Sequence, residues 1–160
     1  MICIIKKWLK QLVLKMENKI KLNKAMLMDR IGAIREDVAR LKLIRTLSLS
    51  EFKINPDNYA VAEHHLRRAS ESVLDIGRHI IAKSDFGKAM DYTEIIDILG
   101  QNNVIPPKFA KEFRKIGGFR NRLVHVYWNV SPEELYNVIK NDLNKLTDFC
   151  RYILKYIENR

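Results

Sequence analysis

Apolar residues that recur every three or four positions run through most of this 160-residue chain, and this spacing is the strongest constraint on its fold. The longest such segments lie at 26–47, 57–83 and 131–157. In each segment the apolar side chains fall on one face of a helix, and that face must be buried against other helices. No segment alternates apolar and polar residues for long enough to indicate a sheet. The sequence therefore predicts an all-α protein.

Residues that start or stop helices divide the chain into four main helices and one short helix. The periodic pattern breaks at 48–58, where Asp57 or Asn58 is expected to cap the second helix. A polar loop at 84–90 then precedes the short third helix, which is expected to end at Gly100 because glycine favours helix C-termini.

Proline and serine mark the starts of the last two helices. Pro106-Pro107 begins the fourth helix, since the first-turn N–H that proline lacks would have no partner inside the helix. Gly117-Gly118 are expected to loosen this helix, which ends near Tyr127. Ser131 is expected to cap the final helix, with Glu134 reaching back to the backbone as in a capping box. The order of elements predicts an up-and-down bundle.

The size and the cysteine content indicate one helical domain. A chain of 160 residues can bury a sufficient core without disulfides or metals. Cys3 and Cys150 lie near opposite ends of the sequence and outside any CxxC motif, so a reducing, cytoplasmic setting is expected. We divide the chain into an N-terminal extension at 1–25 and a helical-bundle domain at 26–160.

The formal net charge of +10 favours anionic partners, with nucleic acid as the first choice and an acidic protein or membrane surface behind it. The charge is unevenly distributed. Residues 1–24 contain seven lysines against Glu17, a net charge of +6, so the other 136 residues carry only +4. The net charge therefore overstates the case for a large nucleic-acid surface on the bundle.

The N-terminal extension also has a helical apolar pattern, with lysines on the opposite side. The apolar residues are Ile5, Trp8, Leu9, Leu12 and Met16. A basic amphipathic helix of this kind can lie on anionic lipid or dock on a partner. The alternatives are a frayed extension or an upstream start codon. Lysines interrupt the segment too early for a secretory signal, and no stretch approaches the roughly 20 apolar residues of a membrane span.

The segment at 120–127, Arg-Asn-Arg-Leu-Val-His-Val-Tyr, combines the groups needed to bind a phosphodiester and to move a proton beside it. A guanidinium can hold a phosphate through two parallel hydrogen bonds, and histidine exchanges protons near neutral pH. Asn121 and His125 are four residues apart and would share a helix face. The side chains of Arg120 and His125, five residues apart, would point about 140° away from each other around the helix axis. A partner subunit across a two-fold axis could complete the site.

Such a site could cleave RNA without a metal. The ribose 2′-hydroxyl would attack the adjacent phosphorus, a step that needs a base, an acid and positive donors for the charge on the phosphate oxygens. DNA lacks this hydroxyl and could not react in this way. Two histidines and two arginines, one of each from each protomer, would suffice.

The Arg-x4-His-x-Tyr motif of Arg120, His125 and Tyr127 resembles the HEPN superfamily, and in particular the HepT-type toxins. Those toxins are the ribonuclease partners of MntA-like minimal nucleotidyltransferase antitoxins. Residues 62–82, with Ser72-Val73-Leu74-Asp75-Ile76-Gly77, resemble the second helix of the family, and 119–128 resemble its signature. The resemblance covers about 26–158.

The resemblance implies a HEPN helical bundle that forms a homodimer, with Arg120 and His125 of both subunits lining a cleft. Asn121 matches the polar position after the arginine and would support the site. Tyr127 matches the tyrosine that the antitoxin AMPylates. The implied function is a toxin of a toxin–antitoxin pair, an RNA endonuclease without metal or cofactor, neutralised by AMPylation of Tyr127 or by antitoxin binding.

Other interpretations of the sequence are open. The chain could be a non-catalytic HEPN module that binds a nucleotide or a nucleotidyltransferase partner, or an RNA-binding adaptor led by residues 1–24. Arg120 could simply pair with a carboxylate such as Asp75 or Glu112, and Asp75 could instead orient His125.

Residues elsewhere in the sequence are assigned no role in the reaction. His64 and His65 are adjacent and would point about 100° apart on a helix, so no metal site is expected there. His79 is interpreted as ordinary helix surface, and the aromatic residues are interpreted as packing.

Overall fold

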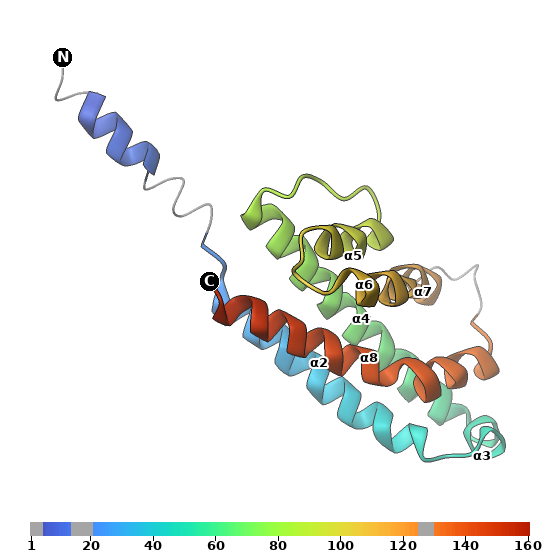
Figure 1. Cartoon of the computed structure of the whole chain (residues 1–160). Helices are drawn as coiled ribbons and strands as arrows, with labels where there is room; N and C mark the ends of the chain where they lie inside the picture. The colour runs from blue at the N-terminus through green and yellow to red at the C-terminus, as the bar shows by residue number, and fades with distance from the viewer. Residues whose placement is uncertain (1–4, 14–20, 125–129) are drawn as a thin grey trace.

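A computed structural model describes residues 5–13, 21–124 and 130–160 of the chain. Residues 5–13 are helical, and the other described residues form seven further helices and no strand, so the all-α prediction is confirmed (Figure 1). The helices are α2 (Lys24–Arg45), α3 (Leu49–Ile54), α4 (Pro56–Ser84), α5 (Tyr92–Gln101), α6 (Pro107–Phe113), α7 (Lys115–Val124) and α8 (Pro132–Glu158).

Two groups of helices make up the bundle. The long helices α2, α4 and α8 pack against one another, while the shorter α5 and α7 pack on α4 and α6 packs on α5 (Figure 1). The apolar faces predicted from the spacing are the buried ones, as in α2, where Leu27, Ile34 and Leu41 are fully buried. Complete burial of such side chains contributes about 1.5–3 kcal/mol each before the entropy of folding is subtracted. α7, which carries the first part of the motif, packs on α4 and α5 of this core.

The segment after α2 contains a helix that the sequence pattern did not predict. Ser48 accepts a hydrogen bond from the N–H of Glu51, whose carboxylate accepts one from the N–H of Ser48, so a capping box starts α3. Phe52 of α3 is buried. The prediction that Asp57 or Asn58 caps the next helix is wrong, because Asn55 is the N-cap and Pro56 occupies the first turn of α4.

Gly100 does not end α5, contrary to the prediction. The helix continues to Gln101, and Asn103 supplies the left-handed backbone conformation, with φ of 55°. Gly100 is buried against α6, where an added Cβ would lie 2.5 Å from the Cβ of Ala110. Its small size is needed for helix packing rather than for a turn.

The predicted fourth helix is two helices, and its break is not at the glycines. Pro106 and Pro107 start α6 as predicted, but α6 gives way to α7 at Arg114. Gly117 and Gly118 both lie inside α7. A Cβ added to Gly117 would lie 2.7 Å from the backbone carbonyl carbon and oxygen of Tyr92, so glycine is needed here for a close approach of α7 to the start of α5.

Only one of the two hydrogen bonds of the predicted capping box is present at the start of the final helix. Ser131 accepts a hydrogen bond from the N–H of Glu134 at 3.2 Å, as expected. The Glu134 carboxylate does not return to the backbone of Ser131, because it binds Arg122 of α7. The link between α7 and α8 thus replaces the second half of the box.

The residues that lead into α2 belong to the packed body. Leu22 is buried, and Asn23 caps α2 by accepting a hydrogen bond from the N–H of Met26. The N–H of Asn23 donates to Nε2 of His79 at 2.9 Å, so His79 is not the plain surface residue that was expected. Burial, together with the charge of Lys83, lowers the pKa of His79. The division of the chain at residue 25 stays a prediction.

Two adjacent glycines give a matched test of the close approach of α7 to α5. We expect Gly117→Ala to lower the free energy of unfolding by about 1–3 kcal/mol, because its methyl group meets the backbone of Tyr92. Gly118 is exposed, and an added Cβ there meets nothing within 4 Å. Gly118→Ala should therefore raise stability by about 0.5–1 kcal/mol. Urea denaturation measures both, and equal effects of the two substitutions would contradict the packing.

Candidate functional site

Arg120 of α7 is held on two sides. Its Nε donates to Oε2 of Glu71 in α4 at 2.7 Å, and its Nη2 lies 2.6 Å from the same oxygen in a salt bridge. Its guanidinium also lies over the ring of Tyr92 in α5, 4.5 Å from the centroid, a cation–π geometry. Only 16% of the side chain is exposed. The guanidinium of the motif is thus fixed in orientation by groups from two other helices.

Glu71 is shared between two arginines. Arg78, two turns further along α4, donates from Nη2 to Oε1 of Glu71 at 2.7 Å and to Oδ1 of Asp75 at 2.7 Å. Nε of Arg30 in α2 lies 3.1 Å from Oδ2 of Asp75. Arg120, Glu71, Arg78, Asp75 and Arg30 form a continuous chain of alternating charge across three helices. We call it the arginine–carboxylate network; it has one positive charge in excess.

The network keeps Glu71 ionised. Burial acts to raise the pKa of Glu71, but hydrogen bonds from Arg78 and Arg120 and the charges of both arginines outweigh it, so the pKa lies below its ordinary value. Burial likewise acts to lower the pKa of Arg78, and its bonds to Asp75 and Glu71 raise it overall. Glu71 is therefore a fixed anion that orients Arg120, rather than a proton donor.

The pairing differs from the alternatives drawn from the sequence. Arg120 pairs with Glu71 and not with Asp75 or Glu112. Asp75 is occupied by Arg30 and Arg78. The alternative in which Asp75 orients His125 stays a prediction, because His125 lies outside the described residues.

Asn121 lines an open pocket next to Arg120. The pocket has a volume of about 540 Å³ and lies between the end of α4, the start of α5 and the loop that joins them. Arg78, Lys88 and Tyr92 contribute to its wall. Two of these residues, Arg78 and Tyr92, also contact the Arg120 side of the network. Asn121 therefore lines a charged, partly apolar hollow, and Arg120 is linked to the wall of this hollow through Arg78 and Tyr92.

The other two predicted site residues, His125 and Tyr127, lie outside the described residues. They follow directly after Val124, the last residue of α7. Their roles stay predictions.

Glu71, Arg78 and Tyr92 were not singled out from the sequence. One signal existed, because Glu71, Asp75 and Arg78 are spaced as neighbours on a single face of a predicted helix. Nothing in the local sequence distinguished Tyr92 from other aromatic residues. Its role depends on the approach of α5 to α7, which is a tertiary contact.

Arg122, on the other side of α7, has a structural partner. Its Nη1 and Nη2 bind the two carboxylate oxygens of Glu134 at the start of α8, with 2.7 Å between Nη2 and Oε2. These hydrogen bonds lower the pKa of Glu134. The pair borders a second pocket of about 400 Å³ with an apolar wall that includes Phe119 and Val138.

His65 and Cys150 are placed in packing environments away from the candidate site. Nδ1 of His65 lies 2.7 Å from Oδ1 of the fully buried Asp37, which also binds Arg68. Burial raises the pKa of Cys150 to about 11, which keeps this thiol protonated. Within the described ranges, no group of three or more histidine, cysteine or acidic residues could hold a metal ion.

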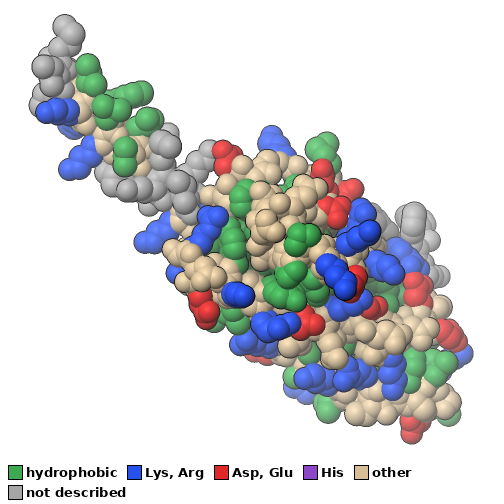
Figure 2. All heavy atoms as spheres, viewed as in Figure 1, with side chains coloured by type: hydrophobic (Ala, Val, Ile, Leu, Met, Phe, Trp, Pro, Cys, Tyr) green, Lys and Arg blue, Asp and Glu red, His purple; other side chains and the backbone are tan. Residues whose placement is uncertain are grey.

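The face of the described residues that is visible in Figure 2 has no single basic patch. Figure 2 shows lysine and arginine side chains spread over the visible face, with acidic side chains between them. None of the described helices is long and apolar enough to cross a membrane.

The model of the ribonuclease HepT-like family matches residues 34–153, three quarters of the sequence. The chain belongs to this family. The matched region covers α4, α5, α6 and α7 in full. It therefore includes every residue of the arginine–carboxylate network except Arg30. The predicted HEPN and HepT-like resemblance is confirmed, and with it the prediction of an endoribonuclease.

Two curated relatives are nucleases. This HepT-like chain is 27% identical over 128 residues to the tRNA nuclease HepT of Aphanizomenon flos-aquae. The aligned region covers 80% of this chain and 87% of the relative. The chain is 27% identical over 89 residues to the mRNA nuclease HepT of Shewanella oneidensis, covering 56% of this chain and 67% of the relative.

Solved structures share the fold of this HepT-like chain. The tri-AMPylated HEPN toxin of Shewanella oneidensis, in complex with MNT antitoxin, matches with a TM-score of 0.74 at 23% identity. The match covers 81% of this chain and 97% of the toxin. YutE of Bacillus subtilis, described as a cytosolic protein of unknown function, matches with the same TM-score and covers 86% of this chain and 92% of its own. At this identity the likeness shows the all-α HEPN fold.

The network makes a pH-dependent contribution to stability. We expect Glu71→Gln to have a lower free energy of unfolding than the natural chain at pH 7, because a neutral amide leaves two arginines without their shared anion. The folded-state pKa of Glu71 lies below its ordinary 4.5. The contribution is therefore complete above pH 4.5 and is lost as the pH falls through the folded-state pKa.

Urea denaturation across this pH range checks the prediction. The difference between the natural chain and Glu71→Gln should shrink as the medium becomes more acidic than pH 4.5. Glu112→Gln, on the exposed side of α6, serves as the matched control and should differ little at any pH. A Glu71→Gln difference that stays constant with pH would contradict the proposed electrostatic role.

Proposed function

We propose that this HepT-like chain is the toxin of a toxin–antitoxin pair and cleaves RNA without a metal, at a composite site built from Arg120 and His125 of both subunits of a homodimer. The observation that carries the proposal is the fixed guanidinium of Arg120 beside the pocket lined by Asn121. Membership in a ribonuclease family and the nuclease activity of the two relatives support it.

The geometry of Arg120 suits the stabilisation of a reacting phosphate. Arginine has five N–H donors; Glu71 accepts a hydrogen bond from Nε and forms a salt bridge with Nη2, so the two Nη1 donors are not used by Glu71. A donor whose orientation is already set needs little reorganisation as charge builds on the phosphate oxygens. The low exposure of the side chain strengthens this interaction by limiting screening by water.

The proposed reaction requires only proton transfer and charge stabilisation. The imidazole of His125 takes the proton of the ribose 2′-hydroxyl, whose oxygen attacks the adjacent phosphorus and expels the 5′-oxygen of the next nucleotide. The second subunit's histidine gives a proton to that leaving oxygen. The arginines bind the non-bridging oxygens, and Asn121 orients the imidazole or the phosphate. The products are a 2′,3′-cyclic phosphate and a 5′-hydroxyl.

We further propose that an MNT-type antitoxin silences this chain at Tyr127, either by AMPylation of the phenol or by binding. Two features support this. The toxin of Shewanella oneidensis with the same fold is tri-AMPylated and in complex with MNT antitoxin. Tyr127 follows His125 by two residues, so an adenylate on its phenol would add bulk and negative charge beside the proposed site.

Paired substitutions in α7 test the nuclease proposal. Purified protein should cleave RNA in EDTA, and Arg120→Ala should reduce the rate by about 100-fold or more through loss of phosphate stabilisation. Arg122→Ala is the matched control, since Arg122 binds Glu134, and it should retain cleavage. A folded protein that leaves RNA intact, or equal losses in both variants, would refute the composite site.

The proposed AMPylation of Tyr127 is tested by co-expressing the protein with a nucleotidyltransferase encoded by a neighbouring gene and measuring the intact mass of the purified chain. The natural chain should gain mass in multiples of AMP, and Tyr127→Phe should gain none, because phenylalanine has no hydroxyl to modify. Tyr136→Phe is the control, and it should be modified as fully as the natural chain. AMP on Tyr127→Phe would show that another residue is the acceptor.

A further inference from the structure

The helix at residues 5–13 lies outside the matched family region and has an exposed apolar face. Every residue of this helix is exposed. Ile5 is 54% exposed, Trp8 61%, Leu9 47%, Leu12 39% and Val13 51%. An isolated helix this short is marginal in water, because propagation gains too little to offset nucleation. The segment therefore needs a surface that covers its apolar side.

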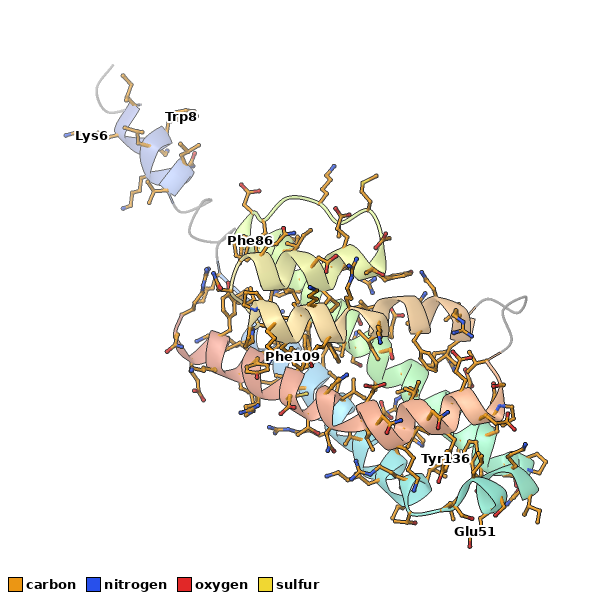
Figure 3. All side chains as sticks on the ribbon, turned by 45° about the vertical axis from the view of Figure 1, so that its right-hand side comes forward. Lys6, Trp8, Glu51, Phe86, Phe109 and Tyr136 are labelled. Atoms are coloured by element: carbon orange, nitrogen blue, oxygen red, sulfur yellow. The ribbon has the colours of Figure 1, made fainter. Side chains whose placement is uncertain are left out.

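Apolar and basic residues are fully separated around this helix. At about 100° per residue, Ile5, Trp8, Leu9, Leu12 and Val13 occupy one continuous arc of about 140°, and the remaining residues occupy the opposite arc. Figure 3 shows Lys6 and Trp8 extending from opposite sides of the helix. Figure 2 shows the same division between hydrophobic and basic side chains. This is the pattern of a helix that lies in an interface between an apolar and an aqueous phase.

The polar face indicates the charge of that interface. It contains Lys6, Lys7 and Lys10 with Gln11, and residues 5–13 contain no acidic residue. The visible face of the helical bundle, in contrast, mixes both signs of charge (Figure 2). Tryptophan favours the headgroup level of a bilayer, where its ring is buried and its N–H stays hydrated. Basic and apolar faces together match an anionic lipid surface.

We propose that residues 5–13 bind an anionic membrane surface, with the helix parallel to the bilayer and its Ile5–Trp8–Leu9–Leu12 face inserted below the headgroups. RNA would be attracted by the same lysines, but it offers no apolar phase to cover Leu9 and Leu12. The helix at residues 5–13 is short, so its affinity for the membrane is modest and depends on both its apolar face and its lysines. The homodimer proposed above presents two such helices, which raises the avidity.

Vesicle co-sedimentation of the full-length protein tests the proposal. The natural chain should pellet with phosphatidylcholine vesicles that contain phosphatidylglycerol and much less with phosphatidylcholine alone. Leu9→Glu should abolish pelleting, because it places a charge in the apolar face. Leu43→Glu makes the same change at a 63% exposed position of α2 and should leave pelleting intact. Both variants should cleave RNA like the natural chain, which separates this test from the nuclease proposal.

Two further measurements test the geometry. Lys6, Lys7 and Lys10 together changed to Gln should weaken binding to the anionic vesicles by about 100-fold, close to fivefold per lysine. The emission of Trp8 is obtained by subtracting the fluorescence spectrum of Trp8→Phe from that of the natural chain. Its maximum should shift to shorter wavelength when the protein binds the anionic vesicles.

Absence of pelleting at low salt, or equal pelleting of Leu9→Glu and Leu43→Glu, would overturn the proposal. The same holds if the lysine substitutions impair RNA binding and leave vesicle binding unchanged.

Discussion

The close approach of α7 to the start of α5 determines the geometry of the candidate site. Gly117 lies against the backbone of Tyr92 with no room for a Cβ. Arg120 is three residues further along α7 and so shares a face with Gly117. The contact that brings the Gly117 backbone to Tyr92 thus also brings the Arg120 guanidinium over the Tyr92 ring. Backbone packing and guanidinium placement are consequences of one helix position.

The arginine–carboxylate network reconciles two opposing needs. A mostly buried guanidinium requires a counter-charge, because unpaired burial of a cation is costly. A counter-charge used by Arg120 alone would neutralise the charge of the guanidinium. Glu71 is instead shared with Arg78, and Asp75 is shared between Arg78 and Arg30. Three arginines against two carboxylates leave the cluster with one net positive charge, so the pairing that holds Arg120 does not neutralise the cluster as a whole.

Local sequence was sufficient for features that depend on local physics. The buried faces of α2 and α8, the start of α6 at Pro107 and the Ser131 cap all follow from spacing and backbone chemistry, and all were predicted. The missed helix α3 had a readable signal in Ser48 and Glu51, obscured by its length of six residues.

Tertiary contacts account for the features that local sequence could not supply. Gly100 and Gly117 were interpreted through glycine's backbone freedom, whereas both are needed for small size against a neighbouring helix. Local sequence cannot separate these two uses. The pairing of Arg120 with Glu71 joins residues 49 positions apart and depends on the packing of α4 against α7.

The partners of three consecutive residues explain how α7 presents its motif. Side chains at 120 and 122 project about 200° apart on a helix, toward opposite sides. Arg120 is tied to Glu71 of α4, and Arg122 to Glu134 at the start of α8. Asn121 projects between them and lines the open pocket on the side of α4 and α5. The Arg120–Glu71 pair thus joins α7 to the helix that forms this pocket, whereas the Arg122–Glu134 pair joins the opposite side of α7 to α8, away from the candidate site.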